Sequence, residues 1–144
     1  MDASWPRRIL VEKRRPENAA VKEIGVTYDE YNDVCRSLPA TTYVMQWGSS
    51  HVWKVGGKVF AIGGWEKLDT PAFTFKVSEL DFEVLRDQPG FRPAPYLASR
   101  GLKWIQLYDD RQCPNDELSH YLSESHHLVT MGLSKKRRRE LGLE

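Results

Sequence analysis

The sequence predicts an α+β fold, an antiparallel β-sheet with helices packed on one face. Three observations support this. A capping-box pattern at Thr27 to Glu30 starts a helix. Gly56-Gly57 lies between two alternating segments, as in a β-hairpin. A long apolar stripe follows Pro114 and predicts a final helix that packs against the sheet.

Length and composition indicate how many domains the chain contains. The chain has 144 residues, of which 40% are hydrophobic and 28% charged, so we expect one globular domain with its own core. We assign residues 27–144 to that domain and residues 1–26 to a basic N-terminal extension. Two cysteines cannot form a disulfide framework, and no apolar run is long enough for a membrane span. We therefore expect a cytoplasmic protein that does not associate with a membrane.

The first predicted helix covers about residues 28–38. Tyr31, Val34, Cys35 and Leu38 follow helical spacing after the capping box, and Pro39 ends the helix. Because Cys35 lies on the apolar face, we expect it to be a core thiol rather than a reactive one.

Four predicted strands cover residues 41–47, 51–55, 58–63 and 72–77. A two-residue turn at Gly56-Gly57 would place Val55 opposite Lys58 and Trp53 opposite Phe60, with His51 opposite Ile62. In the last of these strands, alternation points Phe73 and Phe75 toward the core and Lys76 away from it.

The remaining elements alternate helix and strand. Ser78 caps a second helix, which we expect to end at Pro89-Gly90. Prolines keep residues 91–97 extended, and residues 102–108 form a last strand. The final helix opens at Pro114 and stops at Gly132, and Ser134 caps a basic turn over residues 135–141.

Charge is concentrated at the ends of the chain. Residues 1–15 and residues 134–144 each hold five basic and two acidic side chains, a net charge of +3 per end. The whole chain has a net charge of +1, so residues 16–133 have a net charge of −5. Basic ends on an acidic body suit a polyanionic partner, although solvated tails would look the same.

Enzyme and metal-site patterns are weak. No glycine-rich loop matches a phosphate-binding motif, and the histidines at 120, 126 and 127 lack the spacing of a zinc site. We expect them to be ordinary surface or half-buried side chains. The acidic pairs at 109–110 and 116–117 are explained by a turn and a helix start. The sequence therefore predicts no catalytic residue, metal or cofactor.

The stronger pattern combines basic and aromatic side chains. Alternation places Lys54, Lys76 and Trp104 on the sheet face away from the core, with Gln106 and Tyr108. Such a face can hold a sugar-phosphate backbone and stack bases, but an ordinary solvated face would show the same pattern. The candidate nucleic-acid-binding residues are Lys54, Lys58, Lys76, Arg92, Arg100, Lys103, Trp104, Lys135, Lys136, Arg137, Arg138 and Arg139.

An ordered set of short motifs resembles the MmcQ/YjbR family over about residues 27–141. These motifs are Trp53 to Ala61 (WKVGGKVFA), Phe75 to Val77 (FKV), Pro93 to Leu97 (PAPYL), Lys103 to Ile105 (KWI), Pro114 to Leu118 (PNDEL), Ser125 to Val129 (SHHLV) and Leu133 to Arg137 (LSKKR). The chain departs from the family pattern at His126, where an aromatic residue is commoner, and in its basic extension. The resemblance implies a CyaY-like fold, a DNA-binding role and no known cofactor or catalytic set.

Two functions remain open at this stage. The first is a DNA-binding module that contacts phosphates through the sheet face and the basic C-terminal run. The alternative is a protein-interaction or regulatory domain with a protein partner. It would use the acidic side chains of the second helix, Glu79, Asp81, Glu83 and Asp87. In either case we expect a monomer and no enzymatic activity.

Overall fold

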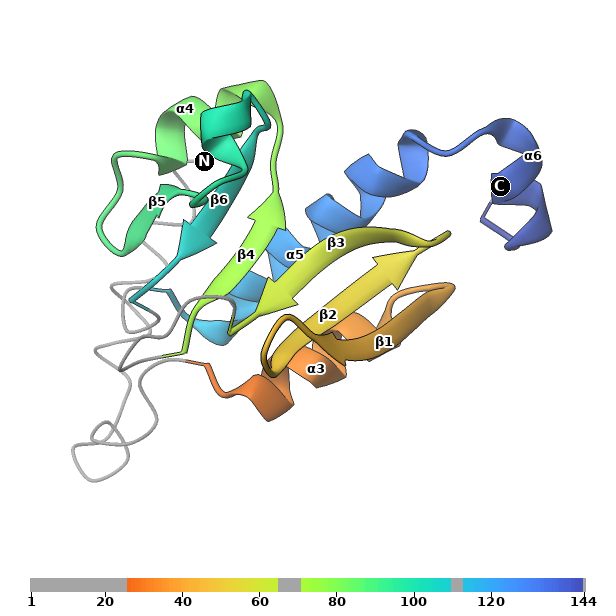
Figure 1. Cartoon of the computed structure of the whole chain (residues 1–144), viewed down its shortest axis with the longest axis horizontal. Coiled ribbons are helices and arrows are strands. Elements are labelled where there is room, and N and C mark those ends of the chain that lie inside the picture. Colours follow the sequence, from red (N-terminus) through yellow and green to blue (C-terminus); the bar gives the residue numbers. More distant parts are fainter. Residues whose placement is uncertain (1–25, 65–70, 110–112, 144) are drawn as a thin grey trace.

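A single antiparallel sheet organises the structure, a computed structural model that describes residues 26–64, 71–109 and 113–143 (Figure 1). The six strands run in the order β1-β2-β3-β4-β6-β5. Their bounds are Thr41–Gln46 (β1), Ser50–Val55 (β2), Lys58–Gly63 (β3), Phe73–Lys76 (β4), Phe91–Pro93 (β5) and Trp104–Leu107 (β6). The helices are Tyr28–Ser37 (α3), Glu79–Leu85 (α4), Asn115–Met131 (α5) and Lys135–Glu140 (α6), with a 3-10 turn at Ala98–Arg100 (η1).

Helices α3, α4 and α5 share one hydrophobic core with the sheet. Phe73 and Phe75 of β4 point into this core, where the Phe75 ring stacks on Tyr121 of α5 with centroids 5.5 Å apart. Phe82 of α4 and Tyr31 of α3 belong to the same cluster. The predicted class is confirmed: α+β, with an antiparallel sheet and helices packed against it.

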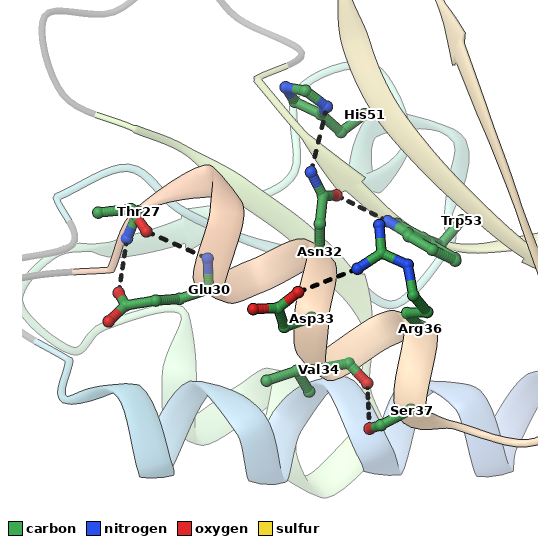
Figure 2. Close-up of polar contacts among 9 residues, drawn as sticks. All are labelled: Thr27, Glu30, Asn32, Asp33, Val34, Arg36, Ser37, His51 and Trp53. Atoms are coloured by element: carbon green, nitrogen blue, oxygen red, sulfur yellow. Dashed lines mark hydrogen bonds and ion pairs between the residues drawn. The ribbon is translucent and has the colours of Figure 1, made fainter.

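Helix α3 begins as the sequence predicts. The side-chain oxygen of Thr27 accepts a hydrogen bond from the Glu30 backbone N–H, and the Glu30 carboxylate accepts one from the Thr27 backbone N–H (Figure 2). Cys35 is fully buried, and this burial raises the pKa of its thiol, as expected for a core cysteine.

Side chains of α3 also fix the position of β2. The amide oxygen of Asn32 accepts a hydrogen bond of 2.8 Å from the Trp53 indole, and the amide nitrogen lies 3.5 Å from Nδ1 of His51 (Figure 2). The Tyr31 hydroxyl donates to the carbonyl of His51. These contacts tie the helix to the β1–β2 side of the sheet.

The predicted hairpin exists, but its register differs beyond the turn. Val55 is opposite Lys58 as expected, whereas Trp53 lies opposite Ala61 instead of Phe60. The cause is a β-bulge that adds Phe60 as an extra residue on β3. As a result His51 pairs with Gly63 rather than Ile62.

Strands β3 and β4 pair only over part of their length. Their ladder covers Ala61 to Gly63 on β3, so the residues of β3 before Ala61 separate from the end of β4. The buried hydroxyl of Ser125 on α5 bridges this gap. It donates to the carbonyl of Phe60 at 2.6 Å and accepts from the backbone N–H of Lys76 at 2.9 Å.

Several predicted boundaries shift. Helix α4 ends at Leu85, four residues before Pro89, and the last strand is shorter than predicted. Part of the proline-rich segment pairs with β6 as the edge strand β5.

His126, expected at or near the surface, is buried, with Nε2 2.8 Å from the Pro39 carbonyl. The predicted N-terminal extension (apart from Val26), the loop at 65–70 and the turn at 110–112 lie outside the described residues.

The Ser125 bridge yields a stability prediction. We expect Ser125→Ala to lower the free energy of unfolding by about 2 kcal/mol, because it leaves a buried carbonyl and a buried N–H without their partner. Urea unfolding followed by circular dichroism measures this change. Ser123→Ala, at an exposed position of the same helix, is the matched control and should stay within about 0.5 kcal/mol. Equal stability of the two variants would contradict the structural role of Ser125.

Candidate nucleic-acid interface

A groove of about 260 Å³ opens where β3 and β4 part. Its lining combines two lysines and a tryptophan from three strands with an apolar floor from α5. The residues are Lys58 and Val59 of β3, Lys76 of β4, Trp104 of β6, and Leu128, Val129 and Gly132 at the end of α5. Three of the candidates predicted from the sequence, Lys58, Lys76 and Trp104, therefore meet in one place.

The local backbone explains why these side chains converge. The bulge at Phe60 bends β3 away from β4, and Ser125 occupies the gap between the two backbones. Lys76 and Trp104 are cross-strand partners on β4 and β6, so their side chains leave the same face of the sheet. The groove is thus a consequence of one irregularity in an otherwise regular antiparallel sheet.

The groove is electropositive at its rim. Lys58 is exposed and Lys76 half-buried, and neither forms an ion pair with a carboxylate among the described residues. Lys54, half-buried on β2, lies opposite Val59 and so borders the same rim. Trp104 is only 9% exposed, so a ligand could meet its indole inside the groove but not on an open face.

The basic helix α6 is held next to this groove. It projects past the β2–β3 hairpin, and Ser134 caps it through the N–H of Arg137, as predicted (Figure 1). A side chain placed at Gly56 in the hairpin turn would meet Leu133 and Leu141, which flank α6. The chain therefore passes from the groove at Gly132 directly into the basic helix.

The five basic residues of α6 have different surroundings. Arg138 donates to the carbonyls of Met131 and Leu133, which close the end of α5. Arg137 forms an ion pair of 3.3 Å with Glu140. Lys135, Lys136 and Arg139 are exposed. Neither of the two lysines forms an ion pair with another described residue.

The remaining candidates do not line the groove. Arg92 donates two hydrogen bonds to the side-chain oxygen of Gln106 and lies over the Tyr108 ring. Lys103 lies over the Phe82 ring at 4.9 Å, and Arg100 is exposed at the end of η1. These three cations belong to the β5, β6 and α4 side of the molecule.

The sheet face away from the core differs from the open basic and aromatic surface that the sequence led us to expect. Val52, Ile62, Thr74 and Gln106 follow one another across its centre, and each is at most 3% exposed. A polyanion cannot lie flat against buried side chains. The centre of this face is therefore closed to a polyanion, whereas Lys54 and Lys76 remain half-buried toward one end of it.

Sequence reasoning missed what shapes the groove. The bulge leaves no compositional signal, since WKVGGKVFA also fits a regular hairpin. Ser125 did offer one: a serine within an apolar helical stripe indicates a polar contact in the core. Helical spacing places Leu128 and Val129 on the same stripe, and both line the groove in the structure.

Among the residues that the structure describes, no group of three or more histidine, cysteine, aspartate or glutamate side chains is arranged to hold a metal ion. No helix in those residues is long and apolar enough to cross a membrane.

Comparison with known families matches the YjbR model to residues 36–128, well over half of the chain. This chain belongs to the YjbR family. The match includes the bulged hairpin, β4, β6 and most of α5, so the family domain contains most of the groove lining. It ends before Gly132 and the basic helix α6.

Solved structures agree with this family assignment. Protein DR2400 of Deinococcus radiodurans, described as a DUF419 domain, superposes with a TM-score of 0.72 at 27% identity, covering 85% of this chain and 92% of its own. A protein from Pseudomonas syringae shares the fold with a TM-score of 0.57 at 18% identity, covering 72% of this chain and 98% of its own. No curated protein matches this chain.

The hairpin turn gives a matched pair of glycine substitutions. Gly56 and Gly57 both have positive φ, +60° and +83°, so alanine at either position costs about 1–2 kcal/mol of backbone strain. An alanine Cβ at Gly56 would also lie 2.7 Å from Leu133, whereas at Gly57 nothing lies within 4 Å. We therefore expect Gly56→Ala to lower the free energy of unfolding by about 1 kcal/mol more than Gly57→Ala in urea titrations. Equal losses would show that the hairpin does not hold the segment that leads into α6.

Proposed function

We propose that this YjbR-family protein binds nucleic acid, with single-stranded segments contacting the groove between β3 and β4 and continuing along α6. The observation that carries the proposal is that Lys58, Lys76 and Trp104 line one groove beside a basic helix. The proposal includes no chemical step and no cofactor.

Phosphate is the ligand chemistry that best fits the groove rim. Each lysine presents a mobile ammonium without a described acidic partner, so a phosphate would not have to compete with an existing ion pair. Neutralising phosphates releases condensed counterions, which makes such binding favourable and dependent on salt. These contacts would be independent of base sequence.

The groove favours a single strand over a duplex. Trp104 lines the groove and is only 9% exposed, so an unpaired base that enters the groove could contact its ring. Paired bases are stacked inside a duplex and expose no face for such a contact.

Helix α6 would extend the contact surface. Lys135 and Lys136 are exposed and follow Gly132 at the groove by only a few residues. A backbone leaving the groove would meet these cations next. They would add affinity without adding specificity.

Fluorescence anisotropy with a labelled single-stranded oligonucleotide, repeated over a salt series, tests the proposal. Neutralising Lys58 and Lys76 together (Lys58→Gln/Lys76→Gln) should weaken binding and reduce the slope of log K against log salt by about 1.4, the value for two phosphate contacts on a single strand. The control variant Arg36→Gln/Arg86→Gln also removes two positive charges, both at positions outside the groove. Its slope should equal that of the wild type.

Two outcomes would contradict the proposal. Equal slopes for the groove and control variants would mean that net charge alone drives binding. No binding at low salt, where attraction is least screened, would remove nucleic acid as the ligand. The alternative function, binding of a protein partner, would then be the better explanation. The exposed Glu79 and Glu83 of α4 would be the first residues to test for that function.

A further inference from the structure

Strand β1 leaves one edge of the sheet open. It is the terminal strand of the sheet, and within the described residues it pairs only with β2. Three consecutive side chains on it are large, apolar and exposed: Tyr43 at 42%, Val44 at 38% and Met45 at 52%. Trp47, directly after the strand, is 50% exposed. A long apolar edge of this kind is a template for pairing with another strand.

The opposite edge of the same sheet is protected. Strand β5 has three residues, and it contains Arg92 and Pro93. Short length, charge and proline are the usual devices that prevent an edge strand from pairing with another chain. Strand β1 has six residues and none of these devices, since its sequence is TTYVMQ. The edge at β5 is therefore protected against pairing with another strand, and the edge at β1 is not. A strand that only faces solvent would not need to lack this protection.

We propose that this protein forms a homodimer in which β1 pairs antiparallel with β1 of a second copy. In a twofold pair every side chain meets a residue from the same strand, and the residue on the axis meets its own copy, so a charged residue at the axis would face a like charge. The sequence TTYVMQ has no charged residue, so β1 avoids this repulsion in any register. A partner of a different kind would gain from charged anchors on the edge, and β1 provides none.

The side-chain alternation restricts the register. Directly opposed residues in a sheet share a face, so the twofold axis must pass beside a residue and not between two residues. With the axis at Val44, Val44 meets its own copy and Tyr43 meets Met45 of the second copy. With the axis at Tyr43, Val44 would meet Thr42 and Met45 would meet Thr41. With the axis at Met45, Val44 would meet the polar Gln46. Only the axis at Val44 pairs all three apolar side chains of the strand with one another, and we assign that register.

Tyr43 is already fixed for this contact. Its hydroxyl lies 2.8 Å from Nδ1 of His51, and its ring lies 5.1 Å from the ring of Trp53. A side chain that is ordered before association loses little conformational entropy when the partner binds. Its exposed edge could then contact Met45 of the second copy, a favourable pairing of sulfur with an aromatic ring.

The sequence alone led us to expect a monomer, so molar mass is the decisive readout. Size-exclusion chromatography with light scattering, over a concentration series, should show a monomer–dimer equilibrium for the wild type. Val44→Lys should raise the dimer dissociation constant by about tenfold or more, because two lysines then face each other at the axis. The control Leu80→Lys introduces the same charge at an exposed position of α4 and should leave the equilibrium unchanged.

A charge-swap pair separates the proposal from simple loss of folding. Val44→Glu alone should be as monomeric as Val44→Lys alone. An equimolar mixture of the two should regain the mass of a dimer, because opposite charges then meet at the axis. A wild type that stays monomeric up to its solubility limit would overturn the proposal. So would a dimer that tolerates Val44→Lys, or two variants that fail to associate when mixed.

Discussion

The hydroxyl of Ser125 is the contact on which the shape of this molecule depends. A sheet normally satisfies the backbone groups of neighbouring strands along their whole length, and β3 and β4 do so only up to Ala61. Beyond that point Ser125 satisfies one carbonyl and one N–H in place of the missing ladder. The strands can therefore diverge without leaving these two buried groups unpaired, and the groove is the space that this divergence opens.

This arrangement also concentrates charge. The body of the chain is acidic overall, yet Lys58 and Lys76 line the groove between the parted strands, and the chain continues from Gly132 at that groove into the basic helix α6. The other candidate cations are held elsewhere, such as Arg92 against Gln106. The protein thus has a basic helix, α6, where α5 ends, and an uncharged strand, β1, at one edge of the sheet.

Much of the fold could be predicted from sequence because it follows from local rules. The capping box at Thr27, the turn at Gly56-Gly57 and the cap at Ser134 all form as predicted, since each depends on residues close in the chain. The bulge at Phe60 could not be predicted, because alternation gives no sign of an inserted residue. The burial of Gln106 was missed for a related reason: alternation assigns a residue to a face but does not say what covers that face. Candidate cations could be chosen from sequence, whereas their convergence depends on how β3 and β4 part.

We propose that nucleic acid binds in the gap that Ser125 bridges. Amide NMR spectra of the wild-type protein, titrated with a short single-stranded oligonucleotide, test this directly. We expect the signals of the Lys76 amide, which donates to Ser125, and of the Trp104 indole to shift and saturate together, while amides of α4 stay unchanged. Binding that shifts only α6 or α4, with the Lys76 and Trp104 signals unmoved, would contradict it.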